Sequence, residues 1–137
     1  MTKPADVVLS FLEMWKVPGG FRRSIETYFC DGSVYENIGM SKTTGLEETL
    51  AFVQWYDDLT GGGWMVAETH ALAVAGNTVL TERVDHMVDG KGTIFLTTRV
   101  MGAFDVEGDK ILAWRDYFDT TAIPAYEGPG RLVKSET

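Results

Sequence analysis

The spacing of apolar residues predicts two helices at the start of the chain. The first follows Pro4 and ends at the Pro18-Gly19-Gly20 break. Its apolar residues recur at intervals of three and four, as they do on one face of a helix. They are Val7, Val8, Phe11, Leu12 and Trp15. A second, shorter helix with the same spacing is predicted from Phe21 to about Cys30.

The spacing of the apolar residues changes in the middle of the chain. Residues 34–38 alternate as in a short extended stretch, and residues 39–45 have the polar, glycine-bounded composition of a loop. Helical spacing returns over residues 46–59 and stops at the three glycines that begin with Gly61. Three helices are therefore predicted before the long strands begin.

The remainder of the chain is predicted to be a four-stranded antiparallel meander. Blocks of about ten residues with β character are separated by short turn signals such as Gly76-Asn77 and Asp89-Gly90. The predicted strands cover residues 64–74, 78–88, 93–106 and 110–119. Helices followed by hairpin-linked strands predict an α+β domain in which a curved sheet wraps around the three N-terminal helices.

Composition favours one globular domain. The 137 residues are 45% apolar and 23% charged, which suits a single domain with its own core. We assign residues 1–137 to that domain, with a core over about 6–119. Residues 120–137 form a C-terminal tail, which is either a lid over the open end of the fold or a loosely held end.

Charge and cysteine content narrow the partners and the compartment. Twelve basic and twenty acidic side chains give a net charge of −8, which repels nucleic acid and anionic membranes. The single cysteine, Cys30, cannot form an internal disulfide and is expected to be a buried apolar residue, which suits a reducing, cytoplasmic location. We find no signal peptide or membrane anchor in the sequence.

A charged pair occupies one predicted strand. Alternation places Thr81, Arg83, Asp85 and Met87 on the same face of that strand. If this is the concave face, Arg83 and Asp85 are buried, which costs several kcal/mol per ion unless each has a partner. The alternative is that the pair lies on the solvent face, where it stabilises the fold by roughly 0–1 kcal/mol. Alternation alone does not decide between the two.

The last predicted strand places a carboxylate among apolar side chains. Asp116 shares a face with Leu112, Trp114 and Phe118. Removal from water would raise its pKa toward the range that suits a general base. The alternative is an aspartate on an edge strand that accepts a backbone N–H.

Tyr35 and Asn37 lie two residues apart on the short extended stretch and so point to one face. Their hydroxyl and amide, together with Asp116, could hold one water molecule by three hydrogen bonds. A Tyr-x-Asn pair taken alone is more often found beside a turn.

No cofactor is predicted. His70 and His86 have no cysteine or carboxylate at ligand spacing, so we assign no metal site. The glycines at 61–63 end a helix instead of beginning one, so they do not form a phosphate-binding loop.

Three motifs, taken in this order and at this spacing, resemble the limonene-1,2-epoxide hydrolases, a branch of the NTF2-like (SnoaL-like) superfamily. The order of elements agrees with that family over about residues 6–119. The most specific motif is the six-residue block in the last strand. The motifs are Val34-Tyr35-Glu36-Asn37, Thr81-Glu82-Arg83-Val84-Asp85 and Trp114-Arg115-Asp116-Tyr117-Phe118-Asp119.

The resemblance implies a cone-shaped NTF2-like fold and a role for each matching residue. Asp116 would be the general base, and Tyr35 and Asn37 would position the water. Asp85 would be the general acid, and Arg83 would lie between the two carboxylates. The implied reaction adds water to a lipophilic epoxide in one step to give a vicinal diol, without a covalent ester and without a cofactor.

The resemblance also implies a deep apolar pocket and a homodimer formed through the outer face of the sheet. The candidate pocket residues are Leu12, Trp15, Met87, Val100, Leu112, Trp114 and Phe118, each of which could equally be part of the core. Two other functions suit the same fold: proton transfer of the ketosteroid isomerase type, and a non-catalytic module that binds a lipophilic ligand. The isomerase chemistry has no use for an arginine between two acids.

Overall fold

The N-terminal helices of the computed structural model lie close to their predicted positions. The structure describes residues 3–132. Helix α1 (Pro4–Glu13) has proline in its first turn and is followed by the 3-10 turn η1 (Met14–Lys16). Helix α2 (Gly20–Tyr28) starts directly after the Pro18-Gly19 break. Proline fixes a backbone angle that suits the first turn of a helix, which accounts for the start of α1.

Helix α3 (Gly45–Thr60) confirms the third predicted helix. It ends at Gly61, whose left-handed backbone (φ of 67°) allows its N–H to donate to the carbonyl oxygen of Asp57. Residues with a side chain rarely adopt this conformation, so glycine is suited to ending the helix here. No helix among residues 3–132 is long and apolar enough to cross a membrane.

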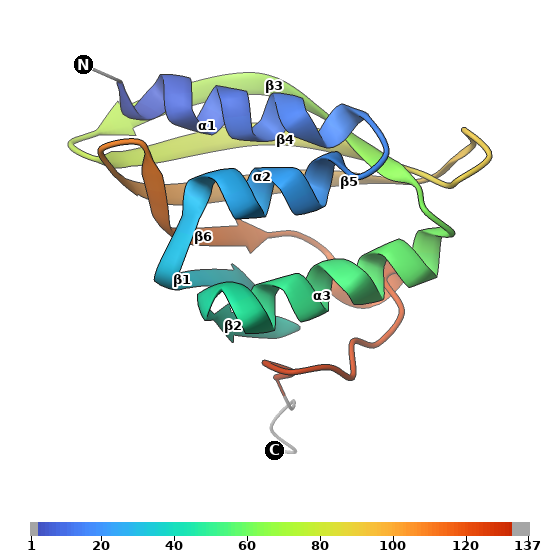
Figure 1. Cartoon of the computed structure of the whole chain (residues 1–137). Helices are drawn as coiled ribbons and strands as arrows, with labels where there is room; N and C mark the ends of the chain where they lie inside the picture. Colours follow the sequence, from blue (N-terminus) through green and yellow to red (C-terminus); the bar gives the residue numbers. More distant parts are fainter. Residues whose placement is uncertain (1–2, 133–137) are drawn as a thin grey trace, which may run out of the picture.

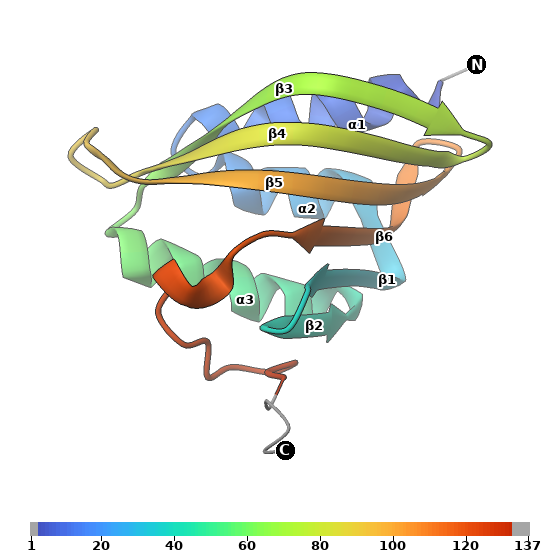
Figure 2. The same ribbon diagram turned by 180° about the vertical axis from the view of Figure 1, so that it is seen from behind.

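Six strands form one mixed sheet in the order β2-β1-β6-β5-β4-β3. The strands β3 to β6 form the predicted antiparallel meander, and β1 joins β6 in a parallel pair. The sheet is curved, and all three helices lie on its concave side (Figures 1 and 2). The strand bounds are β1 Phe29–Asn37, β2 Ser41–Thr44, β3 Trp64–Ala75, β4 Thr78–Val88, β5 Ile94–Glu107 and β6 Lys110–Tyr117.

Two local predictions are corrected by the structure. The second helix ends at Tyr28, and the chain is already extended from Phe29, where helical spacing had suggested continuation to Cys30. Part of the predicted loop 39–45 is strand β2, which pairs with β1. Polar residues fill β2, so the sequence carries no apolar alternation that would have marked it.

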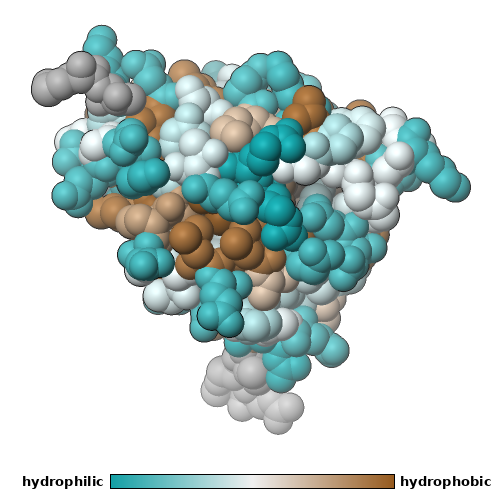
Figure 3. Space-filling view, viewed as in Figure 1, coloured by the Kyte–Doolittle hydropathy of each residue, from teal (hydrophilic) through white to brown (hydrophobic). Residues whose placement is uncertain are grey.

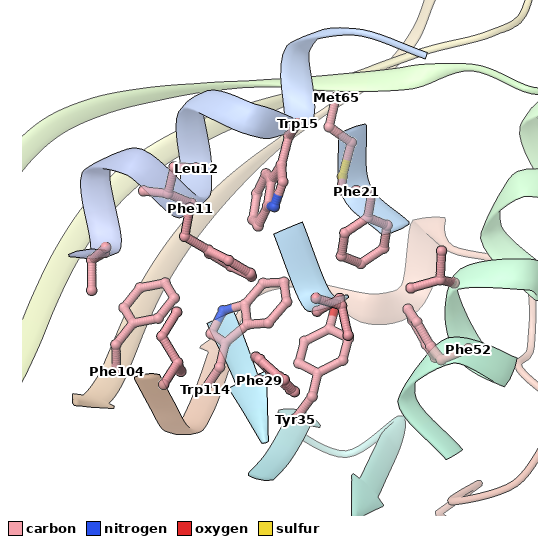
Figure 4. Packing of buried hydrophobic residues seen from close by; sticks show 14 of the residues in the cluster. Phe11, Leu12, Trp15, Phe21, Phe29, Tyr35, Phe52, Met65, Phe104 and Trp114 are labelled. Carbon is pink, nitrogen blue, oxygen red and sulfur yellow. The ribbon is translucent and has the colours of Figure 1, made fainter. Parts of the chain in front are cut away.

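The core between helices and sheet is mainly aromatic (Figure 4). Trp114, on β6, is 1% exposed and lies at its centre. Its ring stacks on Tyr35 with centroids 3.9 Å apart and on Phe104 at 5.9 Å. The rings of Phe11, from α1, and Trp114 pack edge to face, with their centroids 5.1 Å apart. The sheet and the helices therefore meet at Trp114, two residues before Asp116 in the sequence.

The described part of the C-terminal tail packs against the domain. Tyr126 is 3% exposed and contacts Phe52 and Trp55 of α3 at centroid distances of 4.9 and 5.2 Å. The backbone N–H of Lys42, on β2, donates to the carbonyl oxygen of Gly130 at 2.7 Å. These contacts attach part of residues 120–132 to α3 and β2, and residues 133–137 of the predicted tail lie outside the described residues.

The helical side of the molecule carries an apolar patch. Figure 3 shows it between α2 and α3, where hydrophobic side chains lie within a mainly hydrophilic surface. Leu46 and Leu50 of α3 are only partly buried and pack against the core from this side.

Candidate active site

The sheet register brings the candidate residues Asn37 and Asp116 into one row with Gly102 and Thr81. Asn37 on β1 is paired with Asp116 on β6, Asp116 with Gly102 on β5, and Gly102 with Thr81 on β4. The parallel pairing of β1 with β6 creates this row, because it joins two segments separated by most of the chain. The three motifs therefore meet on the concave face of the sheet.

Arg83 is fully buried and binds both candidate carboxylates. Its Nη2 lies 2.8 Å from Asp85 Oδ2 and 2.9 Å from Asp116 Oδ2. Nε donates to Asp85 Oδ1 at 3.1 Å, and Nη1 donates to Asp116 Oδ1 at 3.2 Å. Thr81 Oγ1 accepts a further bond from Nη1 at 3.1 Å. The exposed alternative for Arg83 and Asp85 is therefore wrong.

Gly102 provides the space that this arrangement needs. A Cβ at this position would lie 2.3 Å from Arg83 Nη1 and 2.7 Å from Asp116 Oδ1. Its backbone is not left-handed, so the constraint on this residue is steric. Sequence reasoning missed Gly102, although a glycine inside a strand often marks a place where another group approaches closely.

Asp116 lies on an interior strand, so the edge-strand alternative is also wrong. Trp114 Nε1 donates to Asp116 Oδ1 at 2.8 Å, a contact that the sequence analysis did not foresee. Burial raises the pKa of Asp116 above its usual value, although Arg83 acts in the opposite direction. The negative charge of Asp85 raises this pKa further, so the two carboxylates are electrostatically coupled.

The guanidinium of Arg83 stays charged. Burial alone would lower its pKa, but the two carboxylates raise it by more, and the net shift is upward. The buried group thus holds one positive charge between two carboxylates. Its carbon also lies 5.6 Å from the ring centre of Trp15 and 5.9 Å from that of Phe104, so two aromatic faces add to its stabilisation.

Tyr35 and Asn37 form a short hydrogen-bond chain beside Asp116. The Tyr35 hydroxyl donates to Asn37 Oδ1 at 3.1 Å, and Asn37 Nδ2 donates to Ser41 Oγ at 3.0 Å. Burial raises the pKa of Tyr35 well above its usual value, so the hydroxyl keeps its proton. Ser41 belongs to the unforeseen strand β2, which is why the anchor of Asn37 was not predicted.

A cavity of about 40 Å³, the candidate catalytic cavity, lies between these groups and the helices. Tyr35, Asn37, Asp85 and Asp116 all line it, whereas Arg83 lies behind its wall. This volume holds a few water molecules, since one water needs roughly 10–15 Å³. Its remaining lining residues are Trp15, Met65, Met87, Thr98, Val100, Trp114 and Phe118.

Five of the seven predicted pocket residues line this cavity, and two do not. Leu12, on α1, is 4% exposed and packs in the core outside the cavity lining. Leu112 is 37% exposed, because the pairing of β5 with β6 is irregular there and the alternation of β6 shifts by one residue. Simple alternation along the strand could not reveal this irregularity.

Two further spaces adjoin the candidate catalytic cavity and share lining residues with it or with each other. An inner apolar compartment, also of about 40 Å³, shares Met65, Met87 and Phe118 with it. This compartment shares Met87, Leu59 and Ile123 with an outer groove of about 290 Å³ at the surface. The three spaces form a row from Asp116 to the end of α3 and the C-terminal segment.

The other polar candidates lie elsewhere. His86 contacts Glu68 Oε1 through Nε2 at 2.6 Å and Thr97 Oγ1 through Nδ1 at 2.9 Å, on the outer face of the sheet. Cys30 is partly buried and contacts Ser33 at 3.4 Å. Within residues 3–132, no group of three or more His, Cys, Asp and Glu side chains could hold a metal ion.

Comparison with known proteins gives the same fold class and then a family. The structure resembles an NTF2-like protein of unknown function from Cytophaga hutchinsonii, with a TM-score of 0.67 at 17% identity over 90% of this chain and 96% of that one. It also resembles an LEH-like epoxide hydrolase from Mycobacterium tuberculosis, with a TM-score of 0.67 at 28% identity over 85% of this chain and 83% of that one.

The family follows from sequence. Residues 2–125 match the model of the limonene-1,2-epoxide hydrolase catalytic domain, and the chain belongs to this family. The epoxide hydrolase EphG of Mycobacterium tuberculosis is 31% identical over 96 residues. That match covers 70% of this chain and 61% of the relative, so the chain spans less than two thirds of the relative's length.

We predict that Gly102→Ala lowers the free energy of unfolding by about 1–3 kcal/mol, because the added methyl group overpacks the buried ion cluster. Urea unfolding measures the change. Glu107→Ala, at the exposed end of the same strand, is the control and should change stability little. A Gly102→Ala protein as stable as the control would show that Arg83 and Asp116 do not need this space.

Proposed function

We propose that this chain hydrolyses a lipophilic epoxide to a vicinal diol in one step. The observation that supports this most is the buried Arg83 with a carboxylate on each side, 2.8 and 2.9 Å from its Nη2. Opening an epoxide requires a proton on the departing oxygen while water attacks the carbon from the other side. Two acids in one cavity can divide these tasks.

Charge balance supports the division of tasks. One guanidinium offsets one of the two carboxylates, and a second buried negative charge is costly unless the pair takes up a proton. In the proposed resting state the pair therefore carries one proton. Asp85 uses it as the general acid, and Asp116 is the general base.

The assignment of the base rests on its neighbours. Asn37 is directly paired with Asp116 in the sheet, and Tyr35 donates to Asn37. A water molecule in this corner of the cavity could donate one proton to Asp116 and the other to the amide oxygen of Asn37. As the water oxygen attacks the epoxide carbon, its first proton passes to Asp116, the ring carbon–oxygen bond breaks, and Asp85 protonates the departing oxygen, so no covalent ester is needed.

The cavity lining supports a lipophilic substrate. Aromatic and sulfur-containing side chains surround the two carboxylates, and the volumes of both spaces are well below the roughly 300–1,000 Å³ of typical ligand pockets. Met65 and Met87 line both spaces and are flexible side chains that adapt to a ligand. Movement of these two methionines would join the spaces for a terpene or other alicyclic epoxide.

We also infer that the chain forms a homodimer through the outer face of its sheet, which no helix covers (Figure 2). Met101 and Tyr117 are paired across β5 and β6 on this face and are 51% and 49% exposed. Glu82 and Arg99 line a groove beside them and provide charges of both signs, as a self-complementary surface requires.

Sedimentation equilibrium tests the dimer. We expect a dimer for the parent chain and for Leu9→Glu, a charge placed on the exposed side of α1. Met101→Glu should give a monomer, because two carboxylates would be buried in the interface. A monomeric parent chain, or a dimer that Met101→Glu leaves intact, would contradict the inference.

The reaction is tested by single turnover in oxygen-18 water with limonene oxide, cyclohexene oxide, styrene oxide and a steroid epoxide. We expect labelled diol in the first turnover of excess enzyme, since water attacks directly. Asp116→Asn and Asp85→Asn should each lower kcat by about 10²- to 10⁴-fold, the usual contribution of a general acid or base. The control Asp109→Asn alters an exposed turn residue and should keep full activity.

The other outcomes distinguish the alternatives. Absence of diol from every epoxide, with proton exchange from a ketosteroid, would support the isomerase. Absence of both activities, with ligand binding that neither substitution weakens, would support a binding module. Unlabelled diol in the first turnover would mean that oxygen comes from the protein and would exclude direct attack by water.

A further inference from the structure

Three buried polar side-chain atoms have no hydrogen-bond partner among residues 3–132. They are Trp15 Nε1, Tyr56 Oη and Thr98 Oγ1. Buried polar groups in proteins are nearly always paired, because an unpaired one loses its bonds to water and gains none in return. All three residues line the two neighbouring spaces described above, which makes an occupant of these spaces a candidate partner for the three atoms.

Two of these atoms belong to the catalytic cavity. Trp15 and Thr98 line the same space as Asp85 and Asp116, and Thr98 is paired with Asp85 in the sheet register. The water and the epoxide oxygen of the proposed reaction are polar groups within this space. The proposed reaction therefore accounts for the Trp15 and Thr98 donors without a further ligand group.

Tyr56 is different because it lines only the inner apolar compartment. It lies on α3, is 4% exposed, and its ring packs against Phe21 at a centroid distance of 5.7 Å. Phe21, Phe52 and Met65, three of the apolar residues that line this compartment, are seen together in Figure 4. The other buried polar side chains in its lining are Tyr35 and Asn37, which are bonded to each other, and Asn37 is also bonded to Ser41.

We propose that Tyr56 is a specificity-determining residue whose hydroxyl binds an oxygen atom of the substrate remote from the epoxide. This inference rests on the proposed function and narrows its substrate class to lipophilic epoxides that carry a second oxygen, such as a ketone, ether or ester. The epoxide occupies the catalytic cavity, and the second oxygen occupies the inner apolar compartment. The shared lining residues Met65, Met87 and Phe118 lie between the two groups.

The chemistry of Tyr56 suits a hydrogen-bond donor. Burial, followed by the negative charges of Asp57 and Asp85, raises its pKa, so the hydroxyl is protonated at neutral pH. A substrate acceptor would satisfy a donor that is otherwise unpaired, whereas a hydrocarbon substrate would leave it unpaired. A site with such a donor discriminates against the analogue that lacks the matching oxygen.

A matched pair of epoxides measures this discrimination. Limonene 1,2-oxide carries an isopropenyl group at the ring carbon remote from the epoxide, and the 4-acetyl analogue replaces its terminal CH₂ by a carbonyl oxygen. The two molecules have nearly the same shape and the same epoxide. We expect the parent chain to have a kcat/KM about three- to tenfold higher for the ketone, the range of a single neutral hydrogen bond.

Tyr56→Phe should remove that preference. It should lower kcat/KM for the ketone by the same three- to tenfold and leave that for limonene oxide within about twofold. Tyr28→Phe removes a hydroxyl from a partly buried tyrosine that does not line these spaces, and should keep the preference. Equal kcat/KM values for the two epoxides, or a preference that survives Tyr56→Phe, would overturn the inference while leaving epoxide hydrolysis intact.

Binding measurements separate this inference from the proposed function. The saturated ketone 1-acetyl-4-methylcyclohexane has no epoxide and can be compared with 1-isopropenyl-4-methylcyclohexane by titration calorimetry. Tighter binding of the ketone, lost in Tyr56→Phe, would support the subsite even if neither epoxide were hydrolysed. Equal binding of both compounds by the parent chain would count against it.

Discussion

The buried guanidinium of Arg83 is the constraint on which the concave face of this sheet depends. An ionised group removed from water costs several kcal/mol unless strong partners surround it. Here the partners come from two strands, with Asp85 on the same strand and Asp116 two strands away. Strand β5 passes between them and carries glycine at the crossing point, since any side chain there would displace the ion cluster.

The aromatic core is part of the same arrangement. Trp114 stacks on Tyr35 and donates to Asp116, so the ring that fills the centre of the core also orients the proposed base. Packing and chemistry thus share one residue, and a change that loosens the core would also move the carboxylate. The parallel pairing of β1 with β6 supports both, because it places Asn37 beside Asp116.

The interior contains two neighbouring spaces, and their sizes and linings limit the ligands that fit there. The candidate catalytic cavity is small and is lined by Asp85 and Asp116, and the inner compartment is apolar apart from its tyrosines and Asn37. Flexible methionines line both, so a ligand can occupy the two spaces at once without a change in the sheet. The first space presents carboxylates to a ligand, and the second presents apolar surface and the Tyr56 hydroxyl.

Sequence alone predicted most of the fold and of the candidate site, because periodicity and strand alternation are local properties. Alternation placed Arg83 with Asp85, and Trp114 with Asp116, on common faces, and the structure confirms both. It could not show which face is buried, since that depends on strand pairing. Strand β2, the exposed Leu112 and the role of Gly102 were missed because each depends on a neighbouring strand and not on its own sequence.

The central claim, that Asp85 and Asp116 share the charge of Arg83, is tested most directly by carbon-13 NMR of the Asp116 carboxyl carbon as a function of pH. The account predicts that the pKa of Asp116 lies above the usual aspartate value in the parent chain. In Asp85→Asn it should be lower, because Arg83 then has Asp116 as its one carboxylate partner. An Asp116 signal that titrates identically in the two proteins would contradict the claim.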